Sequence, residues 1–201
     1  MISAILLAAG QSTRMNGENK LVKEIKGTPL IHYAVQNILL SSVDEIVIVT
    51  GFESELIEKI IGKNKKIKFV LNDNYKDGIS SSIKKGIKNL SKKSEAFFIC
   101  LGDMPMVKQS VYNKLIKSRY NYNKKKKPLD KKEIIIPTYS DQAGNPILFS
   151  KYMKDKIMQI NGDVGAKKII ELNKKNILNI PFKSKGITLD FDTKTDFLDE
   201  S

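Results

Sequence analysis

The 201-residue sequence has few of the side chains that most often carry nucleophilic or metal chemistry, with one cysteine, one histidine and no tryptophan. A single cysteine, Cys100, excludes an internal disulfide and a cysteine-rich metal site. A single histidine, His32, excludes a multi-histidine site. We expect both residues to be structural, and we expect the chemistry to rest on carboxylates, cations, hydroxyl groups and the backbone.

The sequence also lacks long hydrophobic runs. No apolar stretch approaches the roughly 18 to 20 residues that a membrane-spanning helix needs. The chain begins Met1-Ile-Ser-Ala-Ile, with no basic n-region or cleavage site, so we expect no signal peptide. A cytoplasmic location without a membrane partner is therefore expected.

Positive charge dominates, because the chain has 35 Lys and Arg but only 22 Asp and Glu, which gives a net charge of +13. Such a charge attracts polyanions, such as a nucleotide, a phosphorylated cofactor or RNA. Most of the lysines, however, lie in helix-like segments or in the run 124–127, without interleaved aromatic residues. This pattern favours solvated faces, and no nucleic-acid partner is expected.

Strand-like and helix-like segments alternate along most of the chain. The length and the hydrophobic fraction of 41% fit one domain, residues 1–201, with a sizeable core. The alternation predicts a mostly parallel sheet with helices on both faces, which is a three-layer α/β fold. The expected strands are 2–8, 45–50, 67–71, 96–101 and 133–137, and the expected helices are 30–40, 53–61, 80–90 and 110–120.

The rhythm changes after residue 132. The residues that follow predict irregular or antiparallel pieces, then helices near 151–159 and 163–173 and short strands around 176–180 and 186–191. We interpret this part as a small C-terminal antiparallel subdomain that folds onto the main sheet and helps to build the pocket for a second substrate.

The first predicted strand ends in Leu7-Ala8-Ala9-Gly10, and a loop with Ser12, Thr13, Arg14 and Lys20 follows. Glycine lets a backbone approach a ligand closely, and successive N–H groups in such a turn form an anion-binding nest. Open α/β sheets bind ligands at the carboxyl ends of their strands. The loop therefore predicts a nucleoside triphosphate site, although it matches neither the P-loop nor the dinucleotide pattern.

Acidic residues follow two later predicted strands. Asp103 ends the strand 96–101, on the same rim as Gly10, where a carboxylate beside a triphosphate would hold Mg²⁺. The alternative is an aspartate that bonds a nearby turn backbone. Asp190 and Asp192 would share one face of a strand, and Asp192 could complete the metal site. Alternatively, Asp192 or Thr193 caps a helix that begins near Thr195.

Three further segments carry polar or glycine-rich motifs. Ser80, Ser81 and Ser82 stand at the start of a predicted helix, where they could cap it or contact a base or ribose. The loops 141–146 and 161–166 are open between plain turn chemistry and contact with an acceptor.

Taken in order, the motifs resemble those of the molybdenum cofactor cytidylyltransferases within the MobA-like NTP transferase group. The matching segments are 7–15, 78–82, 102–105, 144–148, 162–166 and 190–193. The resemblance implies a Rossmann-like fold and transfer of CMP from CTP to the terminal phosphate of molybdopterin or molybdenum cofactor, with Mg²⁺ as the metal. The products would be the cytosine dinucleotide cofactor and pyrophosphate.

The resemblance also implies a role for each matching residue. Arg14, Lys20 and Asp103 would be catalytic, and Asp103 and Asp192 would bind the metal. The nucleotide would be held within about residues 1–105, by Leu7, Ala8, Ala9, Gly10, Ser12, Arg14, Lys20, Ser80, Ser81, Ser82 and Asp103. The acceptor would face residues of the remaining part, about 106–201, namely Gly144, Asn145, Pro146, Gly162 and Asp163.

The alanine at position 9 resembles the pattern of the pyrimidine-using branch, since guanylyl-transferring relatives commonly have glycine at this position. Three positions depart from the pattern: the spacing from Arg14 to Lys20 is one residue longer, Asn145 replaces a common histidine, and Lys167 replaces a usual arginine. GTP, or a sugar or alditol phosphate acceptor, therefore remains an alternative, as does a non-catalytic carrier of the cofactor. A molybdoenzyme or its chaperone is a further possible partner.

Overall fold

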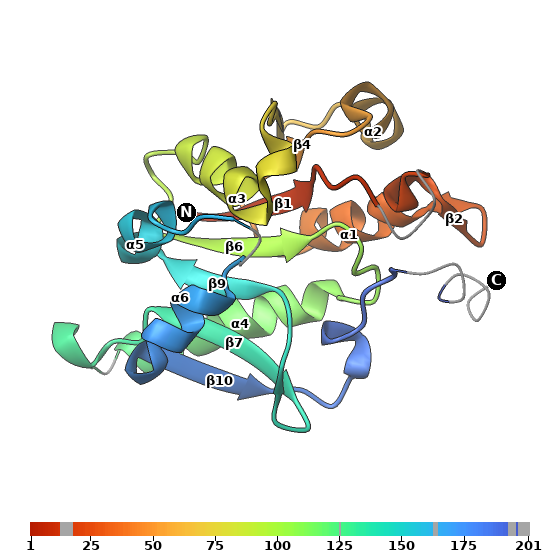
Figure 1. Cartoon of the computed structure of the whole chain (residues 1–201). Coiled ribbons are helices and arrows are strands. Elements are labelled where there is room, and N and C mark those ends of the chain that lie inside the picture. Colours follow the sequence, from red (N-terminus) through yellow and green to blue (C-terminus); the bar gives the residue numbers. More distant parts are fainter. Residues whose placement is uncertain (13–17, 125, 163–164, 193–195, 197–201) are drawn as a thin grey trace.

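The computed structural model describes residues 1–12, 18–124, 126–162, 165–192 and 196. Its centre is an eight-stranded sheet of order β10-β7-β9-β6-β1-β4-β5, with β8 paired to β7 (Figure 1). A two-stranded hairpin, β2–β3, lies apart from this sheet. The strands are β1 (Ile2–Ala8), β2 (Glu24–Ile25), β3 (Thr28–Pro29), β4 (Glu45–Thr50), β5 (Ile67–Leu71), β6 (Ala96–Leu101), β7 (Ile134–Tyr139), β8 (Gln142–Ala143), β9 (Ile147–Ser150) and β10 (Ile177–Pro181).

The pairing confirms the expected mostly parallel sheet. β1 runs parallel to both β4 and β6, β4 runs parallel to β5, and β10 runs parallel to β7. The expected antiparallel piece is β9, which lies between β6 and β7 and runs antiparallel to both. The C-terminal strands therefore extend the main sheet.

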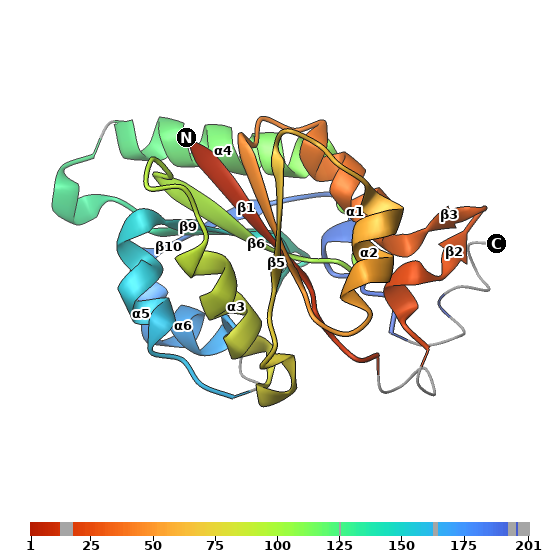
Figure 2. The same cartoon turned by 90° about the horizontal axis from the view of Figure 1, so that it is seen from above.

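Helices cover both faces of the sheet (Figure 2). α1 and α4 lie on one face, and α3, α5 and α6 lie on the other, which confirms the three layers. The helices are α1 (Leu30–Leu39), α2 (Ser54–Ile61), α3 (Ile79–Lys88), α4 (Gln109–Lys124), α5 (Lys154–Met158) and α6 (Lys167–Leu172). Short 3-10 helices are η2 (Lys20–Val22), η3 (Tyr75–Asp77), η4 (Pro128–Asp130), η5 (Lys151–Met153), η6 (Lys174–Asn176) and η7 (Lys185–Ile187).

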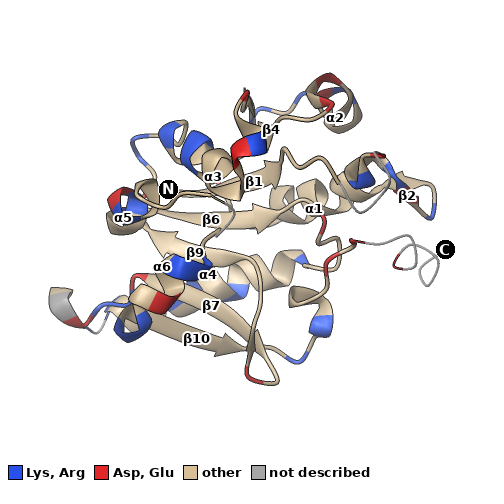
Figure 3. Cartoon of the chain, viewed as in Figure 1, with Lys and Arg blue, Asp and Glu red and all other residues tan. Residues whose placement is uncertain are grey.

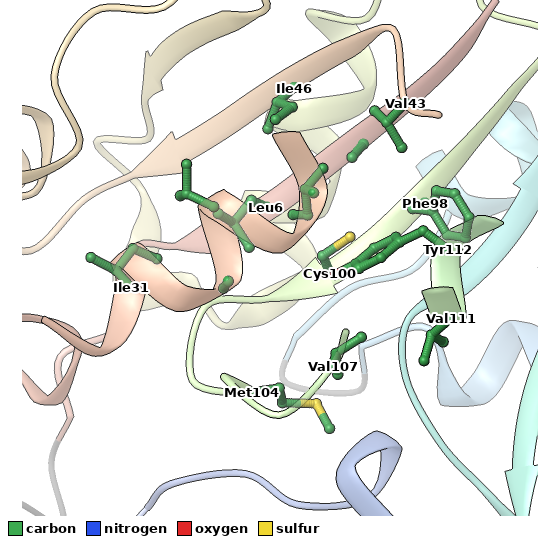
Figure 4. Close-up of a cluster of buried hydrophobic side chains, with 14 of the residues drawn as sticks. Leu6, Ile31, Val43, Ile46, Phe98, Cys100, Met104, Val107, Val111 and Tyr112 are labelled. Atoms are coloured by element: carbon green, nitrogen blue, oxygen red, sulfur yellow. The ribbon is translucent and has the colours of Figure 1, made fainter. Parts of the chain in front are cut away.

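The side chains of β1 alternate between two cores, because successive residues of a strand point to opposite faces. Leu6 packs with α1 and α4, and Ile5 packs with α3. Figure 4 shows the first core, in which the ring of Tyr112 meets Phe98 edge-on at 5.3 Å between centroids. Cys100 is buried in the same cluster, and burial raises the pKa of its thiol, as expected for a structural cysteine.

One expected strand is wrong and several helices differ in extent, since α3 and α4, expected over 80–90 and 110–120, span Ile79–Lys88 and Gln109–Lys124. Residues 186–191 do not form a strand, because the chain turns through η7 and then runs irregularly to Asp192. The helix expected near 151–159 is η5 followed by α5, and the helix expected over 163–173 is observed as α6, with residues 163–164 outside the described part.

None of the helices in the described ranges is both long enough and apolar enough to cross a membrane. Lysines lie on α3, α5 and α6 as well as on loops elsewhere (Figure 3). This distribution over several elements is what solvated helix faces would give.

Replacing Gly86 with alanine should lower the free energy of unfolding by about 1–3 kcal/mol, because it overpacks the contact between α3 and β1. A Cβ on Gly86 would lie 2.4 Å from Cγ2 of the fully buried Ile5. Urea unfolding would measure the change, with the exposed Lys88→Ala on the same helix as control. Equal stability of G86A and K88A would show that this contact can relax.

Candidate nucleotide site

A cavity of about 450 Å³ lies at the carboxyl ends of β1 and β6. These ends are at the same edge of the sheet because the two strands are parallel and Leu7 pairs with Leu101 (Figure 1). Eight of the residues expected in the site line the cavity: Leu7, Ala9, Gly10, Ser12, Lys20, Ser82, Asp103 and Asp192. The volume is in the range of small-molecule sites.

The loop after β1 forms one wall of this cavity. Ala9 is held by the Phe52 N–H, which donates to its carbonyl at 3.3 Å. Ser12 has a positive φ of 52°, and its hydroxyl oxygen accepts the backbone N–H of Lys20 at 3.0 Å. Ser12 therefore ties the loop after β1 to the start of η2, whose N-cap is Asn19. Arg14 lies outside the described residues.

Lys20 lies between the two expected metal ligands. Its Nζ donates to Asp103 Oδ2 at 2.6 Å and also contacts Asp192 Oδ1. All three side chains are largely buried, with exposed fractions of 14% for Lys20, 19% for Asp103 and 30% for Asp192. One cation therefore bridges two carboxylates at the floor of the cavity.

The electrostatics of this cluster indicate an excess of negative charge. Burial raises the pKa of Asp103, and the nearby carboxylates of Asp192 and Asp190 add to the rise, while Lys20 offsets only part of it. Burial by itself would lower the pKa of Lys20, but the two carboxylates outweigh it and raise that pKa. A second positive charge would therefore be favourable here.

The donors suit a hard divalent cation. Asp103 Oδ1 is buried and has no hydrogen-bond partner among the described residues. Magnesium and manganese prefer oxygen ligands and are commonly bound by one or two carboxylates together with phosphates and waters. Asp103 and Asp192 fit this pattern. No group of three or more His, Cys, Asp or Glu side chains in the described ranges forms an all-protein metal cage.

Different chain segments bring these two aspartates together. Asp103 follows β6, and its carbonyl accepts the Phe191 N–H at 2.9 Å, which places the next residue, Asp192, beside it. The side chain of Asp103 pairs with Lys20 rather than with a turn backbone. Thr193 and Thr195, which entered the capping alternative, lie outside the described residues. Asp190 is exposed.

The three serines of α3 have different environments. Ser82 lines the cavity and is 5% exposed, while the described side chains of Ser80 and Ser81 are not part of its lining. The N-cap of α3 is Gly78, without a side-chain cap, so the alternative in which the serines cap the helix is not observed. Ala8 also lies outside the lining, because its side chain packs in the core that faces α1.

The described residues expected to meet an acceptor, Gly144, Asn145, Pro146 and Gly162, do not line this cavity. The Asn145 N–H donates to Ile187 O at 2.8 Å, and a Cβ on Gly144 would lie 2.6 Å from the same oxygen, so packing alone accounts for this glycine. The carbonyl of Gly162 accepts the Ser80 N–H at 3.3 Å, which joins its loop to the start of α3. Asp163 lies outside the described residues.

Sequence reasoning missed part of the lining. The cavity is also lined by Leu21, Tyr75 and Leu101, and by Gly78 and Ile79, which lie in the motif segment 78–82. Leu101 could have been found, since it ends β6 as Leu7 ends β1. No local pattern marks Tyr75, which reaches the cavity from η3.

Several solved structures have this fold. Rv0371c from Mycobacterium tuberculosis H37Rv matches with a TM-score of 0.83 at 19% identity, over 98% of this chain and 96% of that one. A manganese complex of Rv0371c matches with a TM-score of 0.79 at 18% identity over 98% and 96%. The CTP complex of a CMP:2-keto-3-deoxy-manno-octonic acid synthetase matches with a TM-score of 0.75 at 11% identity over 98% and 95%. At these identities the likeness shows the fold alone.

Curated sequences match over different lengths. The molybdenum cofactor cytidylyltransferase of Escherichia coli K12 is 23% identical over 197 residues, which are 98% of this chain and 94% of that protein. The bifunctional protein GlmU of Sorangium cellulosum is 30% identical over 112 residues, which are 53% of this chain and 24% of GlmU. The matched part is about a quarter of the length of such GlmU relatives.

A family model described as the MobA-like NTP transferase domain matches residues 4–177, which is most of the chain. The match includes most of β1, all of β6 and the loop of Gly10, but ends before Asp192. With the fold and the cavity as described, this chain belongs to the MobA-like NTP transferase family.

Proposed function

We propose that this protein transfers CMP from CTP to the terminal phosphate of a molybdopterin-type acceptor and releases pyrophosphate. The observation that carries the proposal is the convergence of the Gly10 loop, Lys20, Asp103 and Asp192 on one cavity at the carboxyl ends of parallel strands. The similarity to the Escherichia coli cytidylyltransferase over nearly the whole chain supports the choice of CTP and acceptor. Ala9, in place of the glycine of guanylyl-transferring relatives, agrees with it.

The triphosphate is proposed to lie against the backbone of Ala9 and Gly10, near the hydroxyl of Ser12. Lys20 would turn from the carboxylates toward the phosphates, and Arg14 would add a second cation. The base and ribose would lie near Ser82, with Ser80 and Ser81 behind it in α3. Leu7 and Ala8, at the end of β1, would contribute to the nucleotide site.

Asp103 and Asp192 would hold Mg²⁺, whose charge, when it is bound, neutralises phosphate oxygens in the transition state. The buried, unpartnered Oδ1 of Asp103 supports this assignment. The manganese complex of a protein with the same fold agrees with it.

The transfer itself needs little from the side chains beyond alignment and charge. A phosphate monoester has a second pKa of about 6, so the acceptor is already largely ionised at neutral pH. One of its oxygens forms a bond to the α-phosphorus of CTP while the bond from that phosphorus to the α–β bridging oxygen breaks. No general base is required, and Arg14 and Lys20 stabilise the departing pyrophosphate.

The acceptor is proposed to bind over the C-terminal part of the chain, about residues 106–201. Gly144, Asn145 and Pro146 would face it from one loop, and Gly162 and Asp163 from another. The hydrogen bond from the Ser80 N–H to the carbonyl of Gly162 joins that loop to α3, which also carries Ser82, and supports this proposal. The product would pass to a molybdoenzyme or its chaperone.

Replacing Gly10 with valine should weaken CTP binding by roughly tenfold or more while leaving the thermal midpoint unchanged. A Cβ at this position would meet no atom of the described residues within 4 Å, so the side chain would cost the fold little and would point into space that the phosphates need. Calorimetric titration with CTP and Mg²⁺ measures the first effect and thermal unfolding the second. Full CTP affinity in G10V would remove this loop from the phosphate site.

The proposed reaction is tested by measuring pyrophosphate release from each of the four NTPs, with molybdopterin and with simple sugar or alditol phosphates as acceptors. We expect release from CTP with molybdopterin to exceed every other pair. Release from GTP, or with a simple phosphate, would assign a different substrate pair to the same chemistry. Binding of the cofactor without release from any NTP would indicate a carrier.

A further inference from the structure

Asn72 is a buried amide outside the cavity lining, at the carboxyl end of the edge strand β5. It is 3% exposed, and its backbone N–H donates to Thr50 O at 2.8 Å, which holds it in line with β4. The proposed chemistry leaves this residue without a role.

The side chain of Asn72 has one orientation that satisfies its neighbours. Its Oδ1 accepts the backbone N–H of Asn74 at 3.2 Å, and an N–H can only donate, so the amide oxygen must face Asn74. The Nδ2 group therefore faces α3, where it donates to Ser81 Oγ at 2.9 Å and to Ser82 Oγ at 3.0 Å. Both protons of the amide are used.

The two serines differ in where their own protons can go. The Ser81 hydroxyl has backbone carbonyls in reach, that of Asn74 at 2.8 Å and that of Gly78 at 2.9 Å. For Ser82 Oγ, the amide of Asn72 is the hydrogen-bond partner among the described residues, and Ser82 lines the cavity. Because a lone pair of Ser82 Oγ accepts the Asn72 amide, the proton of the Ser82 hydroxyl is left to donate into the cavity.

We propose that Asn72 is a positioning residue, which fixes Ser82 as a hydrogen-bond donor to an acceptor oxygen of the bound nucleoside. That oxygen is either a carbonyl of the base or a hydroxyl of the ribose. The inference rests on the proposed function, because it takes the cavity to hold a nucleotide. It adds the direction of one hydrogen bond and the residue that sets it.

Asn72→Asp reverses this direction at nearly constant shape. A carboxylate only accepts, so both serine hydroxyls would turn toward it, and Ser82 would present a lone pair in place of the proton that the nucleoside oxygen accepts. We expect N72D and S82A each to weaken CTP binding by roughly tenfold. The new charge would also repel the triphosphate, but that repulsion does not depend on Ser82.

The test is a double-mutant cycle in CTP affinity, measured by calorimetry with Mg²⁺ on the wild type, N72D, S82A and the double variant. We expect N72D to weaken binding at least fivefold more in the presence of Ser82 than in the S82A background. A merely structural role would give the same loss in both backgrounds, and that result would overturn the inference. Asn89→Asp on the residue after α3, whose Nδ2 donates to Lys85 O, is the matched control and should leave CTP affinity unchanged.

Titration with 2′,3′-dideoxy-CTP distinguishes the two oxygens. If S82A weakens binding of this nucleotide as much as CTP binding, the partner is on the base, and if it leaves that binding unchanged, the partner is a ribose hydroxyl. Should N72D not fold, N72A takes its place in the cycle, with a coupling of the same sign and a few-fold size. A wild type that binds no CTP would overturn the proposed function together with this inference, whereas normal CTP binding without coupling would overturn the inference alone.

Discussion

Asp103→Asn should lower the rate of pyrophosphate release by about a hundredfold or more and leave the fold intact. Asparagine keeps the shape and an oxygen that can accept from Lys20, but it removes the charge that would hold the metal. Loss of one preorganised electrostatic contact typically costs a factor of about 10²–10³ in rate. Because burial already disfavours the ionised carboxylate at this position, the thermal midpoint should not fall by more than a few degrees.

The matched control is Asp190→Asn, which removes an exposed carboxylate two residues before Asp192. Its rate should stay within a few-fold of the wild type, since Asp190 is not part of the cavity lining. A D103N enzyme with near-normal turnover would exclude Asp103 as a metal ligand. Equal losses in both variants would indicate a general field effect instead.

Lys20→Met should change two affinities in opposite directions. Binding of CTP should weaken by roughly tenfold or more, because one of the cations proposed for the triphosphate is lost. Binding of Mn²⁺ to the free protein should strengthen by a similar factor, because Lys20 Nζ lies between Asp103 and Asp192 and competes with a metal for both carboxylates. Electron paramagnetic resonance of Mn²⁺ measures the second effect without any turnover.

Lys23→Met is the control, since Lys23 pairs at 2.6 Å with Glu18, more than half of whose side chain is exposed. It removes the same charge three residues away and should change neither affinity by more than about twofold. Unchanged Mn²⁺ affinity in K20M would show that the carboxylates and the lysine do not share a metal site.

The main strands of the first half were predictable from short apolar runs, and the helices from apolar residues at three-to-four spacing, whereas η2 and the hairpin β2–β3 were not expected. β1, β4, β5 and β6 are observed with the expected bounds. Both ends of α1 and of α2 lie within one residue of the expected bounds. The expected strand over 186–191 is wrong although Ile187, Leu189 and Phe191 alternate as in a strand. Ile187 and Phe191 are buried against the α1-facing core from outside the sheet, so alternate burial arose there without strand pairing.

The position of the candidate site was predictable for a topological reason. Gly10 and Asp103 follow parallel strands, so their neighbourhood follows once β1 and β6 are recognised. The bridge from Lys20 to both aspartates was not predictable, because it depends on how the chain returns from a loop of unknown path. The same holds for Asn72, whose role depends on which way one amide faces.

A crystal structure with CTP and Mg²⁺ would test most directly whether this cavity is a metal-assisted nucleotide site. We predict the triphosphate on the backbone of Ala9 and Gly10, the metal on Asp103 and Asp192, and Lys20 turned from the carboxylates to the phosphates. CTP bound elsewhere on the chain, or a cavity in which Lys20 still bridges both aspartates beside the bound nucleotide, would contradict it.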